Sequence, residues 1–222
     1  MKRKKTGIFL LTAGAVLLLS ALLCFFANRA EDRRAGAQAA RVFHTLVQTV
    51  GDADTLSADV TAVPSVHSPA ESECESDASS PEDPAPQDGA EMPTVFLDGN
   101  GYAGFLRIPA LSLGLPIMSE WSYDRLKIAP CRQFGSAYTN DLVIAAHNYQ
   151  SHFGRLDELN AGDTVYFTDM NGTTFLYSVE AVLVLPPTEV ASVKDSGFDL
   201  ALYTCTYNGK SRIAVFCSRK ST

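Results

Sequence analysis

The stretch Leu200-Ala-Leu-Tyr-Thr-Cys-Thr-Tyr-Asn-Gly-Lys-Ser-Arg-Ile-Ala-Val-Phe-Cys217 consists of two alternating runs around Asn208-Gly209. An Asn-Gly pair between such runs is a strong signal for a two-residue hairpin turn. That turn sets Cys205 opposite Arg212. Side chains directly opposite on one face of a hairpin have β-carbons about 5 Å apart. The sequence therefore predicts a thiol beside a guanidinium group.

Strand side chains alternate between two faces, and the hairpin has one mostly apolar face that we expect to be core. That face carries Leu200, Leu202, Thr204, Ile213, Val215 and Cys217. The other face carries Ala201, Tyr203, Cys205, Arg212, Ala214 and Phe216. Because Cys205 and Cys217 fall on opposite faces, a disulfide between them is not expected. Cys217 is instead expected to be a small buried hydrophobic residue.

Upstream of the hairpin, from Val95 onward, short apolar runs alternate with turn signals, a pattern typical of an all-β barrel or sandwich. The runs, with the hairpin included, are Tyr102–Pro109, Leu113–Met118, Leu142–His147, Thr164–Thr168, Thr174–Leu185, Phe198–Thr204 and Arg212–Cys217. Short helices are expected near Ser122–Ile128 and Phe153–Leu159. Residues 94–222 therefore form the predicted globular domain, with enough chain for one core of ordinary size.

The amino terminus carries the signals of a membrane anchor. Four basic residues at positions 2–5 precede Ile8–Ala27, a run of 20 residues without a charge. Such a run is long enough to cross about 30 Å of hydrocarbon as a helix. A cleaved signal peptide is the alternative, but Ala27-Asn28-Arg29-Ala30 is a poor cleavage site and the run exceeds a usual signal core. We expect residues 1–27 to be a single-pass anchor, with the basic cluster cytoplasmic and the rest of the chain outside.

Residues 28–93 are expected to form a juxtamembrane helix followed by a spacer. Val42, Phe43, Leu46, Val47 and Val50 recur at helical spacing and give residues 28–50 one apolar stripe. The stripe could extend the anchor, self-associate or pack on the globular domain. Residues 51–93 carry 11 acidic residues and no Lys or Arg, with many Ser and Pro. That composition is typical of a disordered, self-repelling spacer.

The predicted globular domain offers few groups for chemistry. A cation beside a thiol lowers the thiol pKa and can bind a developing oxyanion, although an incidental surface arginine would give the same pattern. The only histidines in this domain are His147, which ends an apolar run and opens into a loop, and His152 within that loop. The cysteines lack C-x-x-C spacing, so neither a structural zinc site nor a thioredoxin-type dithiol is expected. No basic stripe supports binding of nucleic acid.

These residues resemble the motifs of the sortase family. Ala145-Ala-His147-Asn resembles its histidine motif, Leu202-Tyr-Thr-Cys205 its nucleophile motif, and Arg212 lies where the family keeps an arginine. Gly104–Ile117 resembles the first two strands of the sortase barrel, and Asp157–Asp163 is also typical. Ala201 departs from the Thr that many members have. The resemblance covers residues 100–218.

The resemblance implies a closed eight-stranded β-barrel, with the eighth strand expected within Cys131–Ala137. It also implies that Cys205 attacks a peptide carbonyl and forms a thioester, that His147 transfers protons and that Arg212 stabilises the oxyanion. The implied reaction requires no metal or cofactor. Thr204, Asn148 and Tyr203 are the candidate substrate-binding residues, Thr204 through its backbone because its side chain faces the core.

The implied substrate is the C-terminal sorting signal of an exported protein, similar to Leu-Pro-x-Thr-Gly (LPxTG). The implied acceptor is an amine on a cell-wall precursor or a pilin lysine. The segment Leu185–Phe198 is expected to border the substrate groove, and its length argues against the subclass with a long helix inserted there.

Three other functions compete with this interpretation. An L,D-transpeptidase places a Gly before its cysteine and a His motif close by, whereas here Thr204 precedes Cys205 and His147 lies 58 positions away. A papain-like protease has its Cys before its His, the reverse of the order here. An anchored, non-enzymatic β-barrel adhesion or scaffold module with an incidental thiol remains the alternative to an enzyme.

Overall fold

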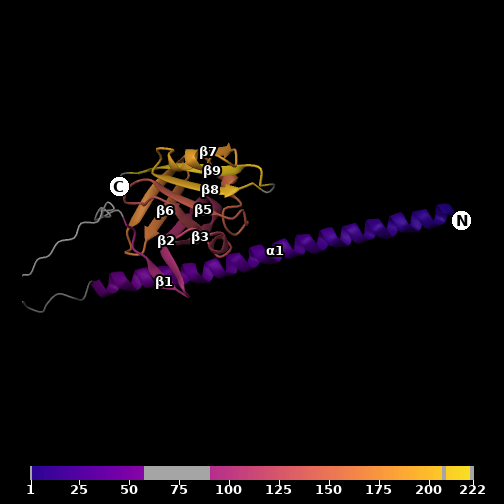
Figure 1. The fold of residues 1–222 in the computed structure, drawn as a ribbon. Helices are drawn as coiled ribbons and strands as arrows, with labels where there is room; N and C mark the ends of the chain where they lie inside the picture. The colour runs from indigo at the N-terminus through magenta and orange to yellow at the C-terminus, as the bar shows by residue number, and fades with distance from the viewer. Residues whose placement is uncertain (1, 58–90, 207–208, 221–222) are drawn as a thin grey trace, which may run out of the picture.

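A computed structural model describes residues 2–57, 91–206 and 209–220 as one long helix lying against a β-barrel (Figure 1). Helix α1 spans Lys2–Ser57. The strands are β1 (Val95–Leu97), β2 (Asn100–Ile108), β3 (Leu113–Met118), β4 (Cys131–Phe134), β5 (Leu142–Ala146), β6 (Thr164–Asp169), β7 (Thr174–Leu185), β8 (Leu200–Cys205) and β9 (Arg212–Arg219). Short helices are η1 (Pro109–Leu111), α2 (Tyr123–Leu126), η2 (Leu156–Glu158) and α3 (Val190–Lys194).

Eight of these strands close into a barrel in the order β2-β3-β4-β5-β8-β9-β7-β6, and β6 pairs back onto β2. All seven predicted runs contain a strand, and the eighth, β4, lies within the expected segment Cys131–Ala137. The closed barrel predicted from the sequence is therefore confirmed. Strand β1 was not predicted; it pairs only with β2, outside the closed ring.

Some element boundaries differ from the sequence expectations. Strand β5 ends at Ala146, so His147 is the first residue of the following loop and not the last of the strand. Helix α2 covers four residues, begun by the Ser122 hydroxyl that accepts a hydrogen bond from the Arg125 N–H at 3.2 Å. In the second predicted helix only Leu156–Glu158 is helical, as a 3-10 turn.

The last hairpin has the predicted register. Strands β8 and β9 are antiparallel, with Cys205 opposite Arg212 and Leu200 opposite Cys217. Backbone N–H of Thr206 donates to the carbonyl of Ser211 at 3.0 Å, which continues the ladder toward the turn. The turn residues 207 and 208 lie outside the described residues. Cys205 and Cys217 are both free thiols, as their opposite faces require.

The barrel interior is filled by the apolar face predicted from the hairpin and by matching residues of the other strands. Its most buried members include Leu106, Ile108, Ile117, Leu142, Ile144, Phe167, Tyr177, Leu200, Leu202, Val215 and Cys217. The opposite face, expected to lie away from the core, is largely buried as well. Ala201, Tyr203, Ala214 and Phe216 belong to a second apolar cluster on the outside of the barrel. Residues of α1, α2 and α3 belong to the same outer cluster, so helices protect this face from water.

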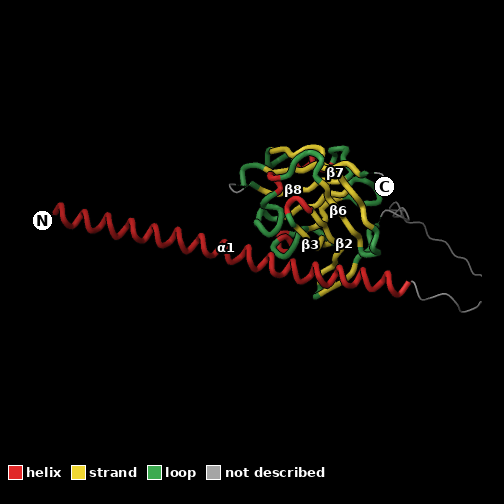
Figure 2. Tube along the Cα trace, turned by 180° about the vertical axis from the view of Figure 1, so that it is seen from behind, coloured by secondary structure: helices red, strands yellow, loops and turns green. Residues whose placement is uncertain are grey.

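The apolar stripe of residues 28–50 packs on the globular domain. Val42, Leu46 and Val50 are buried, Phe43 and Val47 partly so, and the buried stripe extends back to Ala35 and Ala39 at helical spacing. Viewed from behind, α1 runs along the barrel beside β2 and β3 (Figure 2). Of the possibilities considered for the stripe, the structure shows packing on the globular domain.

Helix α1 is continuous from the apolar run into this docked half, and it projects far past the barrel at its amino-terminal end (Figure 1). Within the described residues it is the one helix that is long and apolar enough to cross a membrane. The helix continues to Ser57, beyond the position where the spacer was expected to begin. Residues 58–90 of the predicted spacer, with His67 and Cys74, lie outside the described residues.

Candidate active site

Three neighbouring strands bring the sequence-predicted catalytic residues to one end of the barrel. Strand β5 runs parallel to β8, with Ala146 beside Thr204. Cys205 is the next residue of β8 and His147 is the first loop residue after β5, so the parallel register leads both to the carboxyl ends of neighbouring strands. Strand β9 then places Arg212 opposite Cys205. The three residues therefore lie on or directly after adjacent strands, although 65 positions separate the first from the last.

The alternation of the strands turns these side chains outward. Thr204 is 1% exposed, and its Oγ1 donates to the carbonyl of Ala146 at 2.9 Å inside the barrel. Residues that follow inward-facing positions point to the outside. Cys205, His147 and Arg212 are accordingly half-buried and within reach of solvent. Thr204 itself supports the site from below, and its hydroxyl is not available to a peptide.

Arg212 is held over the turn of the hairpin. Its Nη1 donates to the carbonyls of Ser211 at 3.2 Å and Gly209 at 3.4 Å. A guanidinium offers five N–H donors in a fixed planar fork, so these two bonds anchor one corner and leave the remaining donors for an incoming group. The guanidinium of Arg212 can therefore donate hydrogen bonds to a group bound beside Cys205.

His147 lies in a partly desolvated position that disfavours its charged form. Burial lowers the pKa of His147 from its ordinary value of 6.5, and the nearby ammonium of Lys127 lowers it further. The carboxylate of Glu31 on α1 acts in the opposite direction and raises the pKa. The imidazole ring stacks on Tyr149, with ring centroids 4.8 Å apart and an interplanar angle of 25°.

His152, the second histidine of the domain, is a buried loop residue. It has no solvent exposure, and neither ring nitrogen has a hydrogen-bond partner among the described residues. Burial lowers the pKa of His152 to about 4, helped by His147, while Asp32 and the carbonyl of Ala35 oppose the shift. His152 is therefore neutral near pH 7, and it is too enclosed to exchange protons with a bound peptide.

A surface cavity is lined by the hydrogen-bond partner of Tyr203. The Tyr203 hydroxyl bonds to Oε1 of Gln133, and Tyr203 shares the outer face of β8 with Cys205. Gln133 lines an open cavity of about 580 Å³. The residues around it are Ser119, Glu120, Trp121, Arg132, Gln133, Phe134 and Gly135. Tyr203 and Gln133 therefore connect the face of β8 that carries Cys205 to this cavity.

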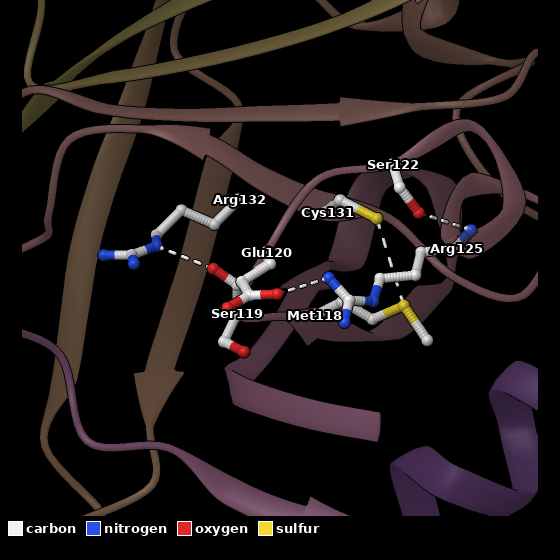
Figure 3. A network of polar contacts seen from close by, with 7 residues as sticks. All are labelled: Met118, Ser119, Glu120, Ser122, Arg125, Cys131 and Arg132. Atoms are coloured by element: carbon white, nitrogen blue, oxygen red, sulfur yellow. Dashed lines mark hydrogen bonds and ion pairs between the residues drawn. The ribbon is translucent and has the colours of Figure 1, made fainter. Parts of the chain in front are cut away.

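The wall of this cavity is braced by polar contacts (Figure 3). Arg132 donates through Nε to the carbonyl of Ser119 at 3.0 Å, and Arg125 pairs with Glu120 at 2.5 Å. The neighbouring Cys131 is fully buried, with its Sγ 3.9 Å from the sulfur of Met118. The lining of the cavity carries both charges, on Arg132 and Glu120.

The segment Leu185–Phe198 contacts one residue that lines this cavity. It contains α3, a helix of five residues, which agrees with the expectation that no long helix is inserted there. Val193 of α3 is buried in the outer cluster, and the Lys194 ammonium lies 5.3 Å from the ring centroid of Phe134, which lines the cavity. That the segment borders the substrate groove stays a prediction.

The described residues hold no group of three or more His, Cys, Asp or Glu side chains placed to bind a metal ion.

A family model for the sortase domain matches residues 106–220, just over half of the chain. The chain belongs to the sortase family. Sortases are transpeptidases, so an enzyme is favoured over the non-enzymatic module. A comparison with curated proteins gave no significant match.

Among solved structures, sortase C of Clostridium perfringens SM101 is similar, at 26% identity over 55% of this chain and 71% of that one, with a TM-score of 0.47. Streptococcus pneumoniae sortase C is 22% identical over 55% of this chain and 70% of that one, with a TM-score of 0.48. A further C. perfringens sortase C structure, 25% identical over 55% of this chain and 71% of that one, has a TM-score of 0.48 and contains the C-terminal cell wall sorting motif.

Sequence reasoning missed the neighbours of this sortase site. Gln133 and Trp121 had no local signal, because the cavity forms only when β4 and the segment before α2 meet. Glu31 and Tyr149 are 118 positions apart and meet through the fold alone. A usable hint was Gly36, a glycine inside the predicted helix, since a helical glycine costs about 1 kcal/mol relative to alanine and often marks close packing.

Proposed function

We propose that this sortase cleaves a sorting peptide with Cys205 as nucleophile and joins the acyl part to an amine. The observation that carries the proposal is the strand register, which puts Cys205 opposite Arg212 and one strand from His147. A nucleophile, a proton carrier and an oxyanion donor on three adjacent strands form a complete set for acyl transfer.

In the first half-reaction the Cys205 thiol gives its proton to His147 and the sulfur attacks the carbonyl carbon of the scissile peptide bond, so that a C–S bond forms as the C=O π bond opens. Arg212 donates hydrogen bonds to the oxygen that gains negative charge. The C–N bond then breaks, and the imidazolium of His147 gives its proton to the leaving amine. The products are a thioester on Cys205, a released peptide and a neutral His147.

In the second half-reaction an acceptor amine attacks the thioester carbon, and His147 takes a proton from that amine. The C–S bond breaks and Cys205 leaves as a thiolate, while the new amide joins acyl group and acceptor. The imidazolium then returns its proton to the Cys205 thiolate, which restores the starting thiol and neutral imidazole, so no electron donor or cofactor is consumed.

The substrate that fits is a short extended peptide similar to Leu-Pro-x-Thr-Gly at the carboxyl end of an exported protein. The cavity lined by Gln133, whose side chain bonds to the Tyr203 hydroxyl, is the proposed place for such a peptide, with Tyr203 and the backbone of Thr204 as expected contacts. Asn148, partly exposed directly after His147, is a further candidate contact. The acceptor is an amine of a cell-wall precursor or a pilin lysine.

Helix α1 supports a location at the cell membrane, with residues 1–27 as a single-pass anchor and residues 94–222 outside the cytoplasm. The intervening residues 28–93 then comprise the docked half of α1 and the acidic spacer.

The test uses the full chain in detergent micelles, incubated with a library of sorting-motif peptides and an amine acceptor. Intact-protein mass spectrometry should show a peptide-sized adduct that Cys205→Ala abolishes. His147→Ala should slow adduct formation by about 10²- to 10⁴-fold, the usual contribution of a positioned acid or base. Cys131→Ala, at a buried thiol, serves as the matched control and should keep the adduct. An adduct that survives in Cys205→Ala would refute the assignment, and a wild type that no peptide acylates would favour the scaffold module.

A further inference from the structure

The loop that carries His147 is fastened to helix α1 as well as to the barrel. Ser151 donates from its backbone N–H to Asp32 Oδ1 at 3.1 Å, and from its hydroxyl to Oδ1 at 2.5 Å and to the Asp32 carbonyl at 3.0 Å. Within the loop, the N–H of Phe153 donates to the carbonyl of His147 at 3.3 Å. A shift of Ser151 should therefore also move the backbone of His147, because both belong to the same short loop.

Close approach of the helix to this loop depends on Gly36. A β-carbon added at Gly36 would lie 2.6 Å from Cβ and 3.0 Å from Oγ of Ser151. Real β-carbons do not approach other atoms that closely, so any larger residue would push the loop away. By contrast, Gly51 on the same helix has no heavy atom within 4 Å of an added β-carbon.

Tyr149 links the helix directly to the imidazole of His147. Its hydroxyl donates to Oε1 of Glu31 at 2.9 Å, while its ring lies stacked on His147. Burial raises the pKa of Tyr149 to about 12, and the bond to Glu31 raises it as well, so the hydroxyl stays a donor. A ring held at its far end by the helix presents a fixed face to the imidazole.

His152 completes the packed layer between helix and barrel. Its ring is fully buried close to the carbonyl of Ala35, and its centroid lies 5.4 Å from that of Tyr149. The ring of Tyr149 therefore contacts both His147 and His152, and its hydroxyl is bonded to Glu31. Such confinement leaves it little freedom to change rotamer.

We propose that the turn Glu31–Gly36 of α1 is a positioning element of the active site, which orients His147 through Ser151 and Tyr149. The inference rests on the proposed role of His147 and adds four positioning residues to it: Glu31, Asp32, Gly36 and Tyr149. Asp32 fixes the loop backbone, Gly36 sets its distance from the helix, and Glu31 holds the tyrosine on which the imidazole stacks.

The physical reason for such a device is the freedom of a histidine at a strand end. His147 begins a loop, and an imidazole there can rotate away from Cys205 unless something packs against it. A misplacement of about 1 Å in a reacting group can lower a rate about 100-fold. The same helix contains the candidate membrane span, so the anchor and the catalytic residue form one continuous mechanical unit.

The test measures single-turnover acylation of the full chain in micelles, with the best peptide from the library. Tyr149→Ala should lower the rate about 10- to 100-fold, whereas Tyr149→Phe, which keeps the stacked ring, should recover most of it. Gly36→Ala should also slow acylation although alanine favours the helix, and its matched control Gly51→Ala should not. Tyr166→Ala, at a partly exposed tyrosine on β6, controls for loss of an aromatic ring.

Charge substitutions give a readout that a purely structural role would not move. The charged or titratable groups around His147 are Glu31 and Asp32 on α1, Lys127 after α2, Cys205 on β8, and Tyr149 and His152 on its own loop. Glu31→Gln should shift the His147 titration to lower pH, and Lys127→Met should shift it to higher pH. The titration is followed by NMR of histidine-labelled protein and in the pH dependence of acylation.

The outcomes separate this inference from the proposed function. Wild-type acylation rates in Tyr149→Ala, Asp32→Ala and Gly36→Ala would overturn the positioning role and leave the nucleophile assignment intact. Absence of any wild-type adduct would refute the proposed function. The NMR titration would still test the contact, because an unchanged His147 titration in both Glu31→Gln and Tyr149→Ala would overturn it without reference to activity.

Discussion

At the scale of single residues, the cysteines of the barrel occupy very different environments. Cys131 and Cys217 are fully buried, and burial raises the pKa of each thiol to about 12. Cys205 is partly exposed at the end of β8. The thiolate is the reactive form, so a buried thiol with a high pKa is nearly inert at neutral pH. Among these three thiols, Cys205 at the end of β8 is therefore the one expected to react.

We predict selective alkylation of Cys205 among these three thiols. With iodoacetamide at pH 8 in micelles, Cys205 should be modified at least about 100-fold faster than Cys131 or Cys217, because it is accessible and because burial both shields the other two thiols and raises their pKa. Peptide mapping by mass spectrometry after a time course measures the three rates. Unfolding in guanidinium should abolish the difference, and equal rates in the folded protein would contradict the burial that underlies the prediction.

At the scale of elements, α1 is a docked part of the domain and not a passive tether. Its stripe of Ala39, Val42, Leu46 and Val50 is buried against the barrel, and Phe43 packs edge-on to Phe105 with ring centroids 5.5 Å apart. The guanidinium of Arg107 lies 5.6 Å from the Phe43 centroid, a cation–π arrangement. These contacts join residues of the helix to β2 and explain why the juxtamembrane half lies parallel to the barrel surface.

Truncation of the stripe should release the helix. Leu46 is 1% exposed, so Leu46→Ala should destabilise the docked state by about 2 to 5 kcal/mol. Limited proteolysis of the full chain in micelles should then cut faster between residues 40 and 57. Gln48→Ala, two positions away on the exposed face, is the matched control. Equal cleavage of both variants would show that the stripe contributes little to docking.

The sequence predicted features that depend on local patterns, but not contacts between residues far apart in the chain. The hairpin register was readable because alternation and an Asn-Gly turn are local, and it placed Cys205 opposite Arg212. Strand β4 fell outside the seven predicted runs, since Arg132 and Gln133 interrupt its apolar character. The stripe on α1 was visible as a face, yet periodicity does not say what covers a face. Contacts such as Glu31 with Tyr149 depend on the closed barrel and leave no local pattern.

At the scale of the whole molecule, the candidate membrane span, the docked half of α1 and the loop after His147 form one connected path. The candidate span continues without interruption into the turn Glu31–Gly36, and that turn contacts the loop after His147. A cavity of about 330 Å³ lies at this junction, between Phe25 and Arg29 of the helix and Asn148 of the loop. If residues 8–27 cross a bilayer, the active-site loop is held near the membrane surface at a fixed height.

The junction also makes stability depend on pH through His152. Its folded-state pKa is about 4, against 6.5 for the free side chain, because burial disfavours the charged ring. Below about pH 6.5 His152 binds a proton in the unfolded chain, whereas in the folded chain it stays neutral down to about pH 4. Stability is therefore complete above pH 6.5 and falls as the pH drops through this window, by up to on the order of 3 kcal/mol.

We predict that His152→Phe removes this loss, since phenylalanine fills the pocket without a titratable group. The measurement is thermal unfolding in micelles between pH 4 and pH 7, followed by fluorescence of Trp121, the one tryptophan of the chain. Carboxylates elsewhere contribute their own pH dependence, so the prediction concerns the difference between wild type and variant. His44→Phe, at an exposed histidine of α1, should keep the wild-type slope. Parallel curves for wild type and His152→Phe would mean that the ring accepts a proton in place, and that the layer between helix and barrel opens to water before the domain unfolds.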